Sequence, residues 1–308
     1  MTDEELKEYV AGGGMIERPE QTTEGYRSAL VKLLIGVADS ELWGIAHYFD
    51  AIRDAPNINA YVAGIALLQD EMGHATIAHR LLRDLGVDSD YLLYSRRLDE
   101  FRHPYFFDIP MESWAEFAVS TALLDRAGFH LLGDIYEGTS YAPWKRALAK
   151  VHREEGFHMR LGERWMSILA ADESEREKVQ RAVDWMFVMG LEFFGQPSPL
   201  KKNVEQLDYR LRHKPNDEIR QGWLADAVPL MVQLGFRVPA HYDAQKGEYV
   251  IDCPFPMDFD EQRKRWKVEE GAVGWARVLE RWKRRGPGLG YCVDTVRAGH
   301  LELWPVAA

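Results

Sequence analysis

Two Glu-x-x-His steps in this sequence could bind metal, because residues three apart on a helix project to the same side. Glu71 and His74 form the first step, in QDEMGHA, and Glu155 and His158 form the second, in REEGFHM. Carboxylate and imidazole groups suit iron and manganese. About one such match is expected by chance in a chain of this composition, so either step alone is weak support for a metal site.

Two further carboxylates strengthen the pattern. Glu41 precedes Glu71 by 30 residues, Asp125 precedes Glu155 by 30 residues, and the two pairs are offset by 84 residues. The chain therefore presents a carboxylate followed by Glu-x-x-His twice, at equal spacing. Four carboxylates and two imidazoles from four helices form the ligand set of a di-iron or di-manganese carboxylate site.

A third match serves as an internal control. Glu100 and His103 have the same spacing, but they precede Pro104 in a predicted connection and lack a partner carboxylate thirty residues earlier. We therefore exclude this pair from the predicted site. The simpler interpretation of any single buried Glu is an ion pair with Arg or Lys, and only the matched spacing of all six residues favours metal.

The elements that must position these residues are long helices. We expect helices over residues 24–55, 57–85, 112–136, 143–170, 174–193, 216–235 and 258–285. A long connection over 87–111 separates the first pair from the second, which is the connectivity of a ferritin-like four-helix bundle. The predicted fold is therefore all-α.

The remaining segments are expected to surround this bundle as one structural domain. Residues 1–20, polar and rich in glycine, predict a flexible N-terminal arm, and 21–195 form the bundle. Residues 196–308 form a C-terminal extension packed on it, with a short β-hairpin in HYDAQKGEYVID and an irregular tail over 286–308.

The predicted helix faces place the candidate ligands inside. Glu41 lies in an apolar stripe with Leu34, Ala38, Ile45 and Tyr48. A carboxylate there is costly unless it is paired or bound to metal. The other five candidates share similar faces, and four carboxylate charges balance two divalent cations. The nearby histidines break the symmetry and are expected to be structural or to support the ligands; they are His47, His79, His130 and His152.

Composition excludes several classes of function. The net charge of −11 argues against non-specific binding to nucleic acid or anionic membranes. Two cysteines, Cys253 and Cys292, cannot hold an iron–sulfur cluster that needs four, and they suit a reducing cytosol. The sequence has neither a signal-peptide core nor an apolar stretch long enough to span a membrane. We therefore expect a cytoplasmic protein.

Several segments resemble a known family. SELWG, LLQDEMGHA, LLDRAG and REEGFHMR are similar to the metal-binding segments of the catalytic subunits of bacterial phenylacetyl-CoA epoxidases, which are multicomponent monooxygenases. The resemblance continues through SYAPWKRAL, PNDEIRQGWLADAVPLMVQLGFRVP and KRWKVEEG. A related partner subunit in that family lacks most of the ligands, whereas this chain carries all six.

The resemblance implies a function in phenylacetate catabolism and aromatic degradation. Two irons, or manganese, would be bound by Glu41, Glu71, His74, Asp125, Glu155 and His158. Electrons from NADPH would arrive through a separate reductase, a structural sister subunit would be the other partner, and O2 would donate one oxygen atom to the ring of an acyl-CoA. The carboxylates Glu41, Glu71, Asp125 and Glu155 would serve the catalysis.

The phosphates of CoA require cations. The densest basic run outside the last predicted helix follows the PSP breaker, and we expect some of its members to bind the CoA end of the substrate; they are Lys201, Lys202, Arg210, Arg212 and Lys214. The competing interpretation is a solvated loop.

Three alternative functions share the ligand chemistry. The chain could be a related oxygenase that acts on another aryl or acyl thioester, a ferritin-like metal-binding protein without oxygenase activity, or a manganese catalase. The sequence leaves open the metal, the physiological thioester and the subunit stoichiometry.

Overall fold

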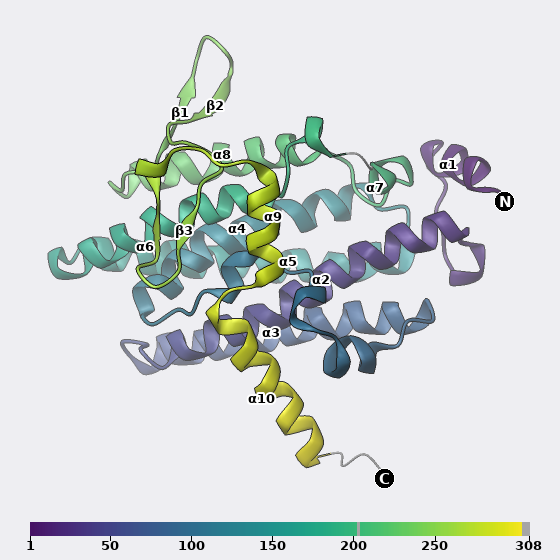
Figure 1. Ribbon diagram of the computed structural model, residues 1–308, viewed down its shortest axis with the longest axis horizontal. Coiled ribbons are helices and arrows are strands. Elements are labelled where there is room, and N and C mark those ends of the chain that lie inside the picture. Colours follow the sequence, from purple (N-terminus) through teal and green to yellow (C-terminus); the bar gives the residue numbers. More distant parts are fainter. Residues whose placement is uncertain (202–203, 304–308) are drawn as a thin grey trace.

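Four long helices form the centre of the protein (Figure 1). The computed structural model describes residues 1–201 and 204–303. The central helices are α2 (Glu24–Ile52), α3 (Ile58–Asp84), α4 (Trp114–Gly138) and α5 (Ala142–Ala170). Helix α2 packs against α3 and α4 packs against α5, with a long crossover between the two pairs. The predicted all-α, ferritin-like bundle is confirmed.

The helices begin where side chains can cap them. Thr23, Asn57 and Ser113 each accept a hydrogen bond from a backbone N–H of the first turn of α2, α3 and α4, respectively. Such caps satisfy donors that have no partner within the helix. Helix α5 has Pro143 in its first turn instead, where the missing N–H costs little.

A glycine permits a close approach between α4 and α5. A Cβ atom at Gly162 of α5 would lie 2.3 Å from the backbone nitrogen of Ala122 on α4. Any larger residue would therefore push the two helices apart. This close contact helps to hold the ligand-bearing faces of α4 and α5 at a fixed separation.

The crossover between α3 and α4 is tied to α2 by a buried ion pair. It contains three short helical turns, η2 (Tyr91–Ser95), η3 (Leu98–Glu100) and η4 (Tyr105–Asp108). Arg96 donates to both carboxylate oxygens of Asp39 on α2, at 2.9 and 2.5 Å. The backbone N–H of Arg102 donates to the same carboxylate at 2.8 Å. The crossover therefore has a defined position against the bundle.

Two apolar clusters lie on either side of the candidate ligands along the bundle. One contains Tyr48, Leu67 and Ala118, and the other contains Leu34, Ala78 and Leu148. The acidic and imidazole groups occupy the layer between them. The apolar clusters supply most of the burial free energy, and the polar layer needs a separate source of stabilisation.

Two helices cover the outer face of the second pair. Helix α6 (Glu173–Phe193) packs on α4 and α5, and α8 (Asn216–Gln233) packs on α4. Trp223 of α8 donates its indole N–H to the carbonyl oxygen of Leu123 at 2.8 Å. Short turns η5 (Ser198–Leu200) and α7 (Glu205–Asp208) connect α6 to α8.

The predicted β-hairpin is present. Strands β1 (Ala240–Asp243) and β2 (Glu248–Ile251) pair antiparallel, and Gly247 in the turn has a φ angle of 71°. The hairpin projects from the bundle beyond α8 (Figure 1).

The N-terminal segment differs from the flexible arm expected over residues 1–20. It contains α1 (Asp3–Ala11), whose cap is Thr2, and the short turn η1 (Pro19–Gln21). Leu6 and Val10 lie four residues apart on one face of α1 and are fully buried. Sparse apolar residues at helical spacing thus anchor a segment that its polar composition suggested would be loose.

The C-terminal segment also differs from the helix expected over 258–285. It forms a small hairpin of β3 (Phe259–Asp260) and β4 (Arg265–Trp266), then the turn η6 (Val268–Glu270) and helix α9 (Trp275–Arg284). Gly271 has a φ angle of 77°, which ends the preceding turn and cannot continue a helix.

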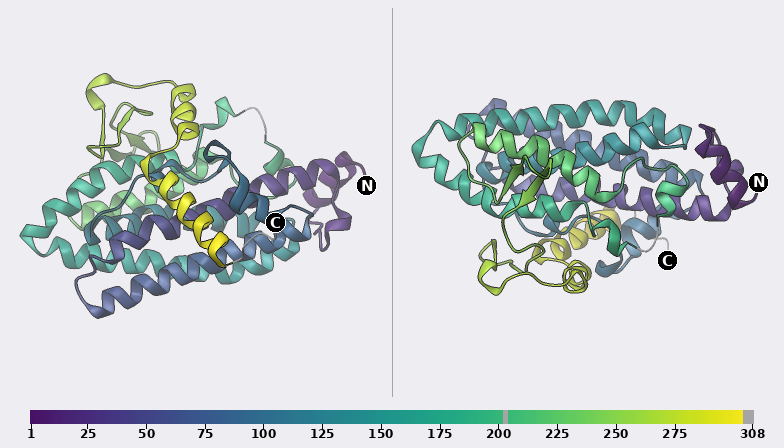
Figure 2. Two further views of the ribbon diagram at one scale, coloured as in Figure 1. Left: turned by 60° about the horizontal axis from the view of Figure 1, so that its bottom comes forward. Right: turned by 90° about the horizontal axis from the view of Figure 1, so that it is seen from above.

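Residues 286–308 were expected to be irregular, but α10 (Pro287–Leu303) occupies most of this range, and residues 304–308 lie outside the described part. GPGLG therefore opens a helix, since proline is favoured in a first turn. Leu289 and Val293 of α10 pack against Trp43 and Phe101. Figure 2 shows α9 and α10 lying across the outside of the bundle.

The division at residues 21–195 and 196–308 remains a prediction. Within residues 1–201 and 204–303, none of the helices combines the length and apolar character needed to cross a membrane.

Candidate metal centre

The six predicted ligands lie together at the middle of the bundle, and all six are buried. Glu41 comes from α2, Glu71 and His74 from α3, Asp125 from α4, and Glu155 and His158 from α5. They form two overlapping groups whose potential ligand atoms lie within 4.8 Å of one another. The groups are Glu41, Glu71, His74 and Glu155, and Glu71, Asp125 and His158.

Two of the carboxylates reach both imidazoles. Glu71 has one oxygen 3.8 Å from Nδ1 of His74 and the other 3.2 Å from Nδ1 of His158. Glu155 has one oxygen 3.3 Å from Nδ1 of His74 and the other 3.8 Å from Nδ1 of His158. Each of these two carboxylates therefore lies between the two imidazoles.

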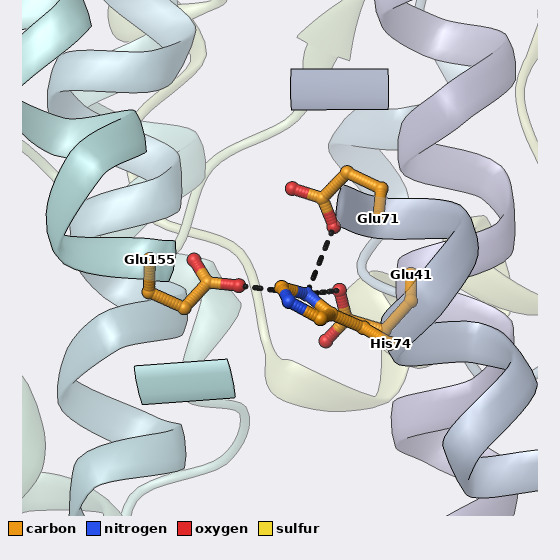
Figure 3. A group of neighbouring side chains, drawn as sticks. All are labelled: Glu41, Glu71, His74 and Glu155. Atoms are coloured by element: carbon orange, nitrogen blue, oxygen red, sulfur yellow. Dashed lines mark ion pairs between the residues drawn. The ribbon is translucent and has the colours of Figure 1, made fainter. Parts of the chain in front are cut away.

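The other two carboxylates each belong to one half-site. Glu41 lies 3.4 Å from Nδ1 of His74, and Figure 3 shows this imidazole surrounded by the carboxylates of Glu41, Glu71 and Glu155. Asp125 groups with His158 and Glu71. Each imidazole therefore has one further carboxylate beside it, Glu41 for His74 and Asp125 for His158.

The outer nitrogen of each imidazole contacts another carboxylate. Nε2 of His74 lies 3.0 Å from Glu154, and Nε2 of His158 lies 3.4 Å from Asp70. Asp70 and Glu154 directly precede the two Glu-x-x-His steps and have the same 84-residue offset as the ligands. These two carboxylates were not predicted, although the repeated offset is a signal in the sequence that could have found them.

Tyr48 provides a further contact that was not predicted. Its hydroxyl group donates a hydrogen bond to Asp125 and accepts one from Ser120 at 3.2 Å. Burial raises the pKa of Tyr48, and the nearby charge of Asp125 raises it further. Tyr48 therefore stays protonated and holds one oxygen of Asp125 by hydrogen bonding.

The carboxylates have pKa values that differ according to their neighbours. Burial, followed by the charge of Glu71, raises the pKa of both Glu41 and Asp125. Burial alone would also raise the pKa of Glu71, but its contacts with His158 and His74 lower it below the ordinary value. Contact with the two imidazoles therefore favours the charged form of Glu71, in contrast to Glu41 and Asp125.

The imidazoles have raised pKa values despite their burial. Burial alone would lower the pKa of His158, but its contact with Glu71 outweighs this and raises the value to about 10. Glu155 and Glu41 raise the pKa of His74 in the same way, against the effect of burial. Protonated imidazoles therefore offset part of the carboxylate charge when no metal ion does so.

These residues fit a pair of divalent cations. The Nδ1 atoms of His74 and His158 and Oδ2 of Asp125 are buried and lack a hydrogen-bond partner among the described residues. Such atoms are costly unless something binds them. Two divalent cations would bind these atoms and balance the four carboxylates, so the donor set matches a dinuclear carboxylate centre.

A cavity of about 420 Å³ reaches the centre from the outside of the bundle. Glu41 and Gly128 contribute to its lining, and a Cβ atom at Gly128 would lie 3.9 Å from Glu155. Most of the remaining lining is apolar and includes Leu131, Leu132, Ile135, Met189 and Phe193. A volume in this range suits a small-molecule ligand.

Exposed cations from three separate elements also line this cavity. They are Lys32 of α2, Arg102 of the crossover and Lys283 of α9. None of them was predicted, because they form no basic run: Arg102 follows Lys32 by 70 residues, and Lys283 follows Arg102 by 181 residues. The cavity therefore combines an apolar interior with exposed charges, which are these three cations and the carboxylate of Asp99.

The predicted basic run lies elsewhere, and its four described members do not line this cavity. Arg210 donates to the carbonyl oxygen of Val10 at 3.2 Å, and the buried Arg212 donates to that of Lys214 at 2.7 Å. Lys201 is exposed, and Lys202 lies outside the described residues. The role of this basic run in binding CoA remains a prediction.

His103, from the excluded pair of Glu100 and His103, lies outside both groups of potential ligands, and so do the histidines near the predicted ligands. His103 is buried against Asp108 and Arg285, and His130 contacts Asp226 at 2.8 Å. His152 stacks on Phe129 with 4.2 Å between ring centroids.

Comparison with known proteins places the chain in a catabolic family. Residues 1–259 match the sequence model of a family described as Phenylacetic acid catabolic protein. The chain is also similar to one of the subunits of 1,2-phenylacetyl-CoA epoxidase from Escherichia coli (strain K12). The two are 29% identical over 256 residues, which covers 81% of this chain and 82% of that relative.

Proposed function

The chain belongs to the family of phenylacetic acid catabolic proteins, and on this premise we propose that it is the catalytic subunit of a multicomponent di-iron monooxygenase. Its substrate would be phenylacetyl-CoA, whose aromatic ring is converted to an epoxide. The observation that carries the proposal is the convergence of six buried ligands beside a cavity that suits an acyl thioester.

The overall reaction balances with a two-electron donor. One atom of O2 enters the ring as the epoxide oxygen, and the other leaves as water with two protons and two electrons. Two irons held by the six ligands would supply the reductive activation of O2. The electrons would come from NADPH through a separate reductase.

The residues of this chain have distinct roles in the proposal. Glu71 and Glu155 hold the two halves of the centre together, because each reaches both imidazoles. Glu154 and Asp70 orient the imidazoles through their outer nitrogens. Tyr48 holds Asp125 in place. The apolar cavity beside Glu41 would position the aryl ring and keep water from it.

Cations around the cavity would bind the phosphates of CoA. Lys32, Arg102 and Lys283 are favoured by their position, while the basic run from Lys201 to Lys214 remains a second candidate. The proposal also includes a cytoplasmic location and assembly with a sister subunit, and the assembly is supported by the name of the relative, which is one component of a larger enzyme.

The experiment that tests the function measures O2 consumption and product together. Iron-loaded protein, combined with its reductase and sister subunit, is given NADPH and phenylacetyl-CoA. We expect one O2 consumed per epoxide formed, with one labelled oxygen atom in the product when ¹⁸O2 is used. The His158→Ala variant is the matched negative control.

Other results would identify the alternatives. Rapid peroxide disproportionation without reductant would indicate a catalase. Iron binding without turnover of any thioester would indicate a metal-binding protein without oxygenase activity. Turnover of a different aryl thioester in preference to phenylacetyl-CoA would retain the chemistry and correct the substrate.

A further inference from the structure

One wall of the cavity comes from the part of the chain beyond the family match. The match ends at residue 259, whereas Leu279, Trp282 and Lys283 of α9 line the cavity beside the metal centre. These three residues are spaced as i, i+3 and i+4, so they share one face of the helix. The ligands thus come from the matched region, and α9 comes from outside it.

Helix α9 shows a clear division of its surfaces. Trp275, Val278 and Arg281 are buried, whereas Ala276 and Arg277 are exposed. A helix of 10 residues is marginal by itself in water, so its position depends on the contacts it makes with the rest of the protein.

A buried ion pair fixes the middle of α9 against α6. Arg281 donates to both carboxylate oxygens of Glu192 at 2.6 and 2.5 Å, and to the carbonyl oxygen of Met257 at 2.8 Å. Glu192 itself lines the cavity. A buried ion pair adds little net stability, but its strict geometry can define one position for a helix.

A second buried contact fixes the end of α9 against the crossover. Arg285 lies 3.4 Å from Asp108 and donates to the carbonyl oxygen of His103 at 3.0 Å. The N–H of Gly286 donates to Asp108 at 3.1 Å. A Cβ atom at Gly286 would lie 2.7 Å from Cβ of Asp108, so this approach requires glycine.

We infer that α9 is the selective wall of the substrate cavity, with Leu279 and Trp282 determining which acyl groups fit beside the metal centre. This inference rests on the proposed function for the identity of the ligand as an aryl-acyl thioester. The rest of the apolar lining includes Leu131, Leu132 and Ile135 of α4 and Met189 and Phe193 of α6. Arg281 and Arg285 are positioning residues that hold α9 in its place along this cavity.

The test changes the volume of the α9 wall in both directions. Leu279→Ala enlarges the cavity and Leu279→Phe reduces it, while Ala276→Leu adds volume on the exposed face of α9 as a matched control. Each variant is titrated in its iron-free form with phenylacetyl-CoA, 3-phenylpropionyl-CoA and 1-naphthylacetyl-CoA. Turnover of the same thioesters is measured with the iron-loaded complex.

We expect Leu279→Ala to shift the preference toward the larger thioesters by about tenfold or more, since a change of this size in an apolar pocket typically has that effect. Leu279→Phe should shift it the other way, and Ala276→Leu should leave it unchanged. Helical circular dichroism and iron content should match the unmodified protein in all three variants.

Unchanged preferences in both Leu279 variants would overturn the inference, as would an equal shift in Ala276→Leu. The binding titrations separate this failure from that of the proposed function. If thioesters bind and the preference shifts but no epoxide forms, the inference about α9 holds and the oxygenase proposal fails. If none of the thioesters binds the unmodified protein, both are wrong.

Discussion

Nε2 of His74 on α3 lies 3.0 Å from Oε2 of Glu154 on α5, the residue that directly precedes Glu155. His158 on α5 makes the reciprocal contact with Asp70 on α3, at 3.4 Å. The two helices therefore exchange the same interaction in both directions. Each carboxylate occupies the outer nitrogen of an imidazole and leaves its Nδ1 atom facing the other candidate ligands.

Removing one of these outer carboxylates should weaken iron binding. We expect Glu154→Ala to lower the affinity for iron about 10- to 100-fold, because the ring of His74 would lose its orientation. Competition with a chelator measures this affinity. Glu8→Ala, at an exposed carboxylate of α1, is the control. Equal affinity in Glu154→Ala and the unmodified protein would show that this contact has no role in metal binding.

Removing a ligand should abolish binding without unfolding the bundle. Glu71→Ala deletes one of the two carboxylates that reach both imidazoles, and His158→Ala deletes one imidazole. We expect both variants to lose iron in metal analysis while keeping most of the helical circular dichroism, since the apolar clusters on either side remain intact. His213→Ala is the control, at an exposed histidine. Full iron content in both ligand variants would refute the site.

The ligand positions were predictable because they follow from local periodicity. Glu41 lies within an apolar stripe of helical spacing, and the equal offsets relate it to Asp125. Asp70 and Glu154 follow the same offset and could have been found in the same way. Helical faces and repeated spacing are properties of the sequence itself, and so is the bundle that they specify.

The cavity was not predictable, because it depends on contacts between distant elements. Lys32, Arg102 and Lys283 come together only after the crossover and α9 have packed against α2. The helix that we predicted over 258–285 was too long at its start, because α9 begins only at Trp275. The chain turns at Lys264, with a φ angle of 48°, and again at Gly271, but neither turn clearly interrupts the apolar pattern of the sequence. The conformation and position of these segments depend on packing against distant parts of the chain.

His47 should make the protein sensitive to acid. It is buried among Tyr48, Phe106 and Phe107, and burial lowers its pKa to about 3, with smaller contributions from the charges of Lys264 and His103. Between about pH 3 and the unfolded pKa of ~6.5, the unfolded chain binds a proton here that the folded chain does not. The free energy of unfolding therefore falls on acidification, by roughly 1.4 kcal/mol per pH unit from this residue.

Urea unfolding at several pH values between 5 and 6.5 checks this contribution. Because Leu cannot be protonated, we expect His47→Leu to flatten the dependence of the unfolding free energy on pH, whatever its effect on absolute stability. His213→Leu, at an exposed histidine, should keep the original slope. An equal slope in His47→Leu would mean that His47 is protonated in the folded protein.

Neutralising the cations around the cavity should weaken substrate binding in a manner that depends on salt. Arg102 and Lys283 are exposed and lie on different elements, so the double variant Arg102→Gln, Lys283→Gln should leave the fold intact. We expect its KM for phenylacetyl-CoA to rise several-fold at low salt, with little change in kcat. The increase should shrink as salt rises, because salt screens the interaction of exposed cations with phosphates.

The double variant Lys201→Gln, Lys214→Gln distinguishes the two candidate sites for CoA. If the cations beside the cavity bind the phosphates, this second variant should retain the original KM and the original salt dependence. The opposite result would assign the phosphates to the basic run after α6, and the acyl group would then have to reach the metal centre by way of α7. Gln206 of α7 lines the cavity, so α7 lies between the two candidate sites, and KM at low salt decides between them.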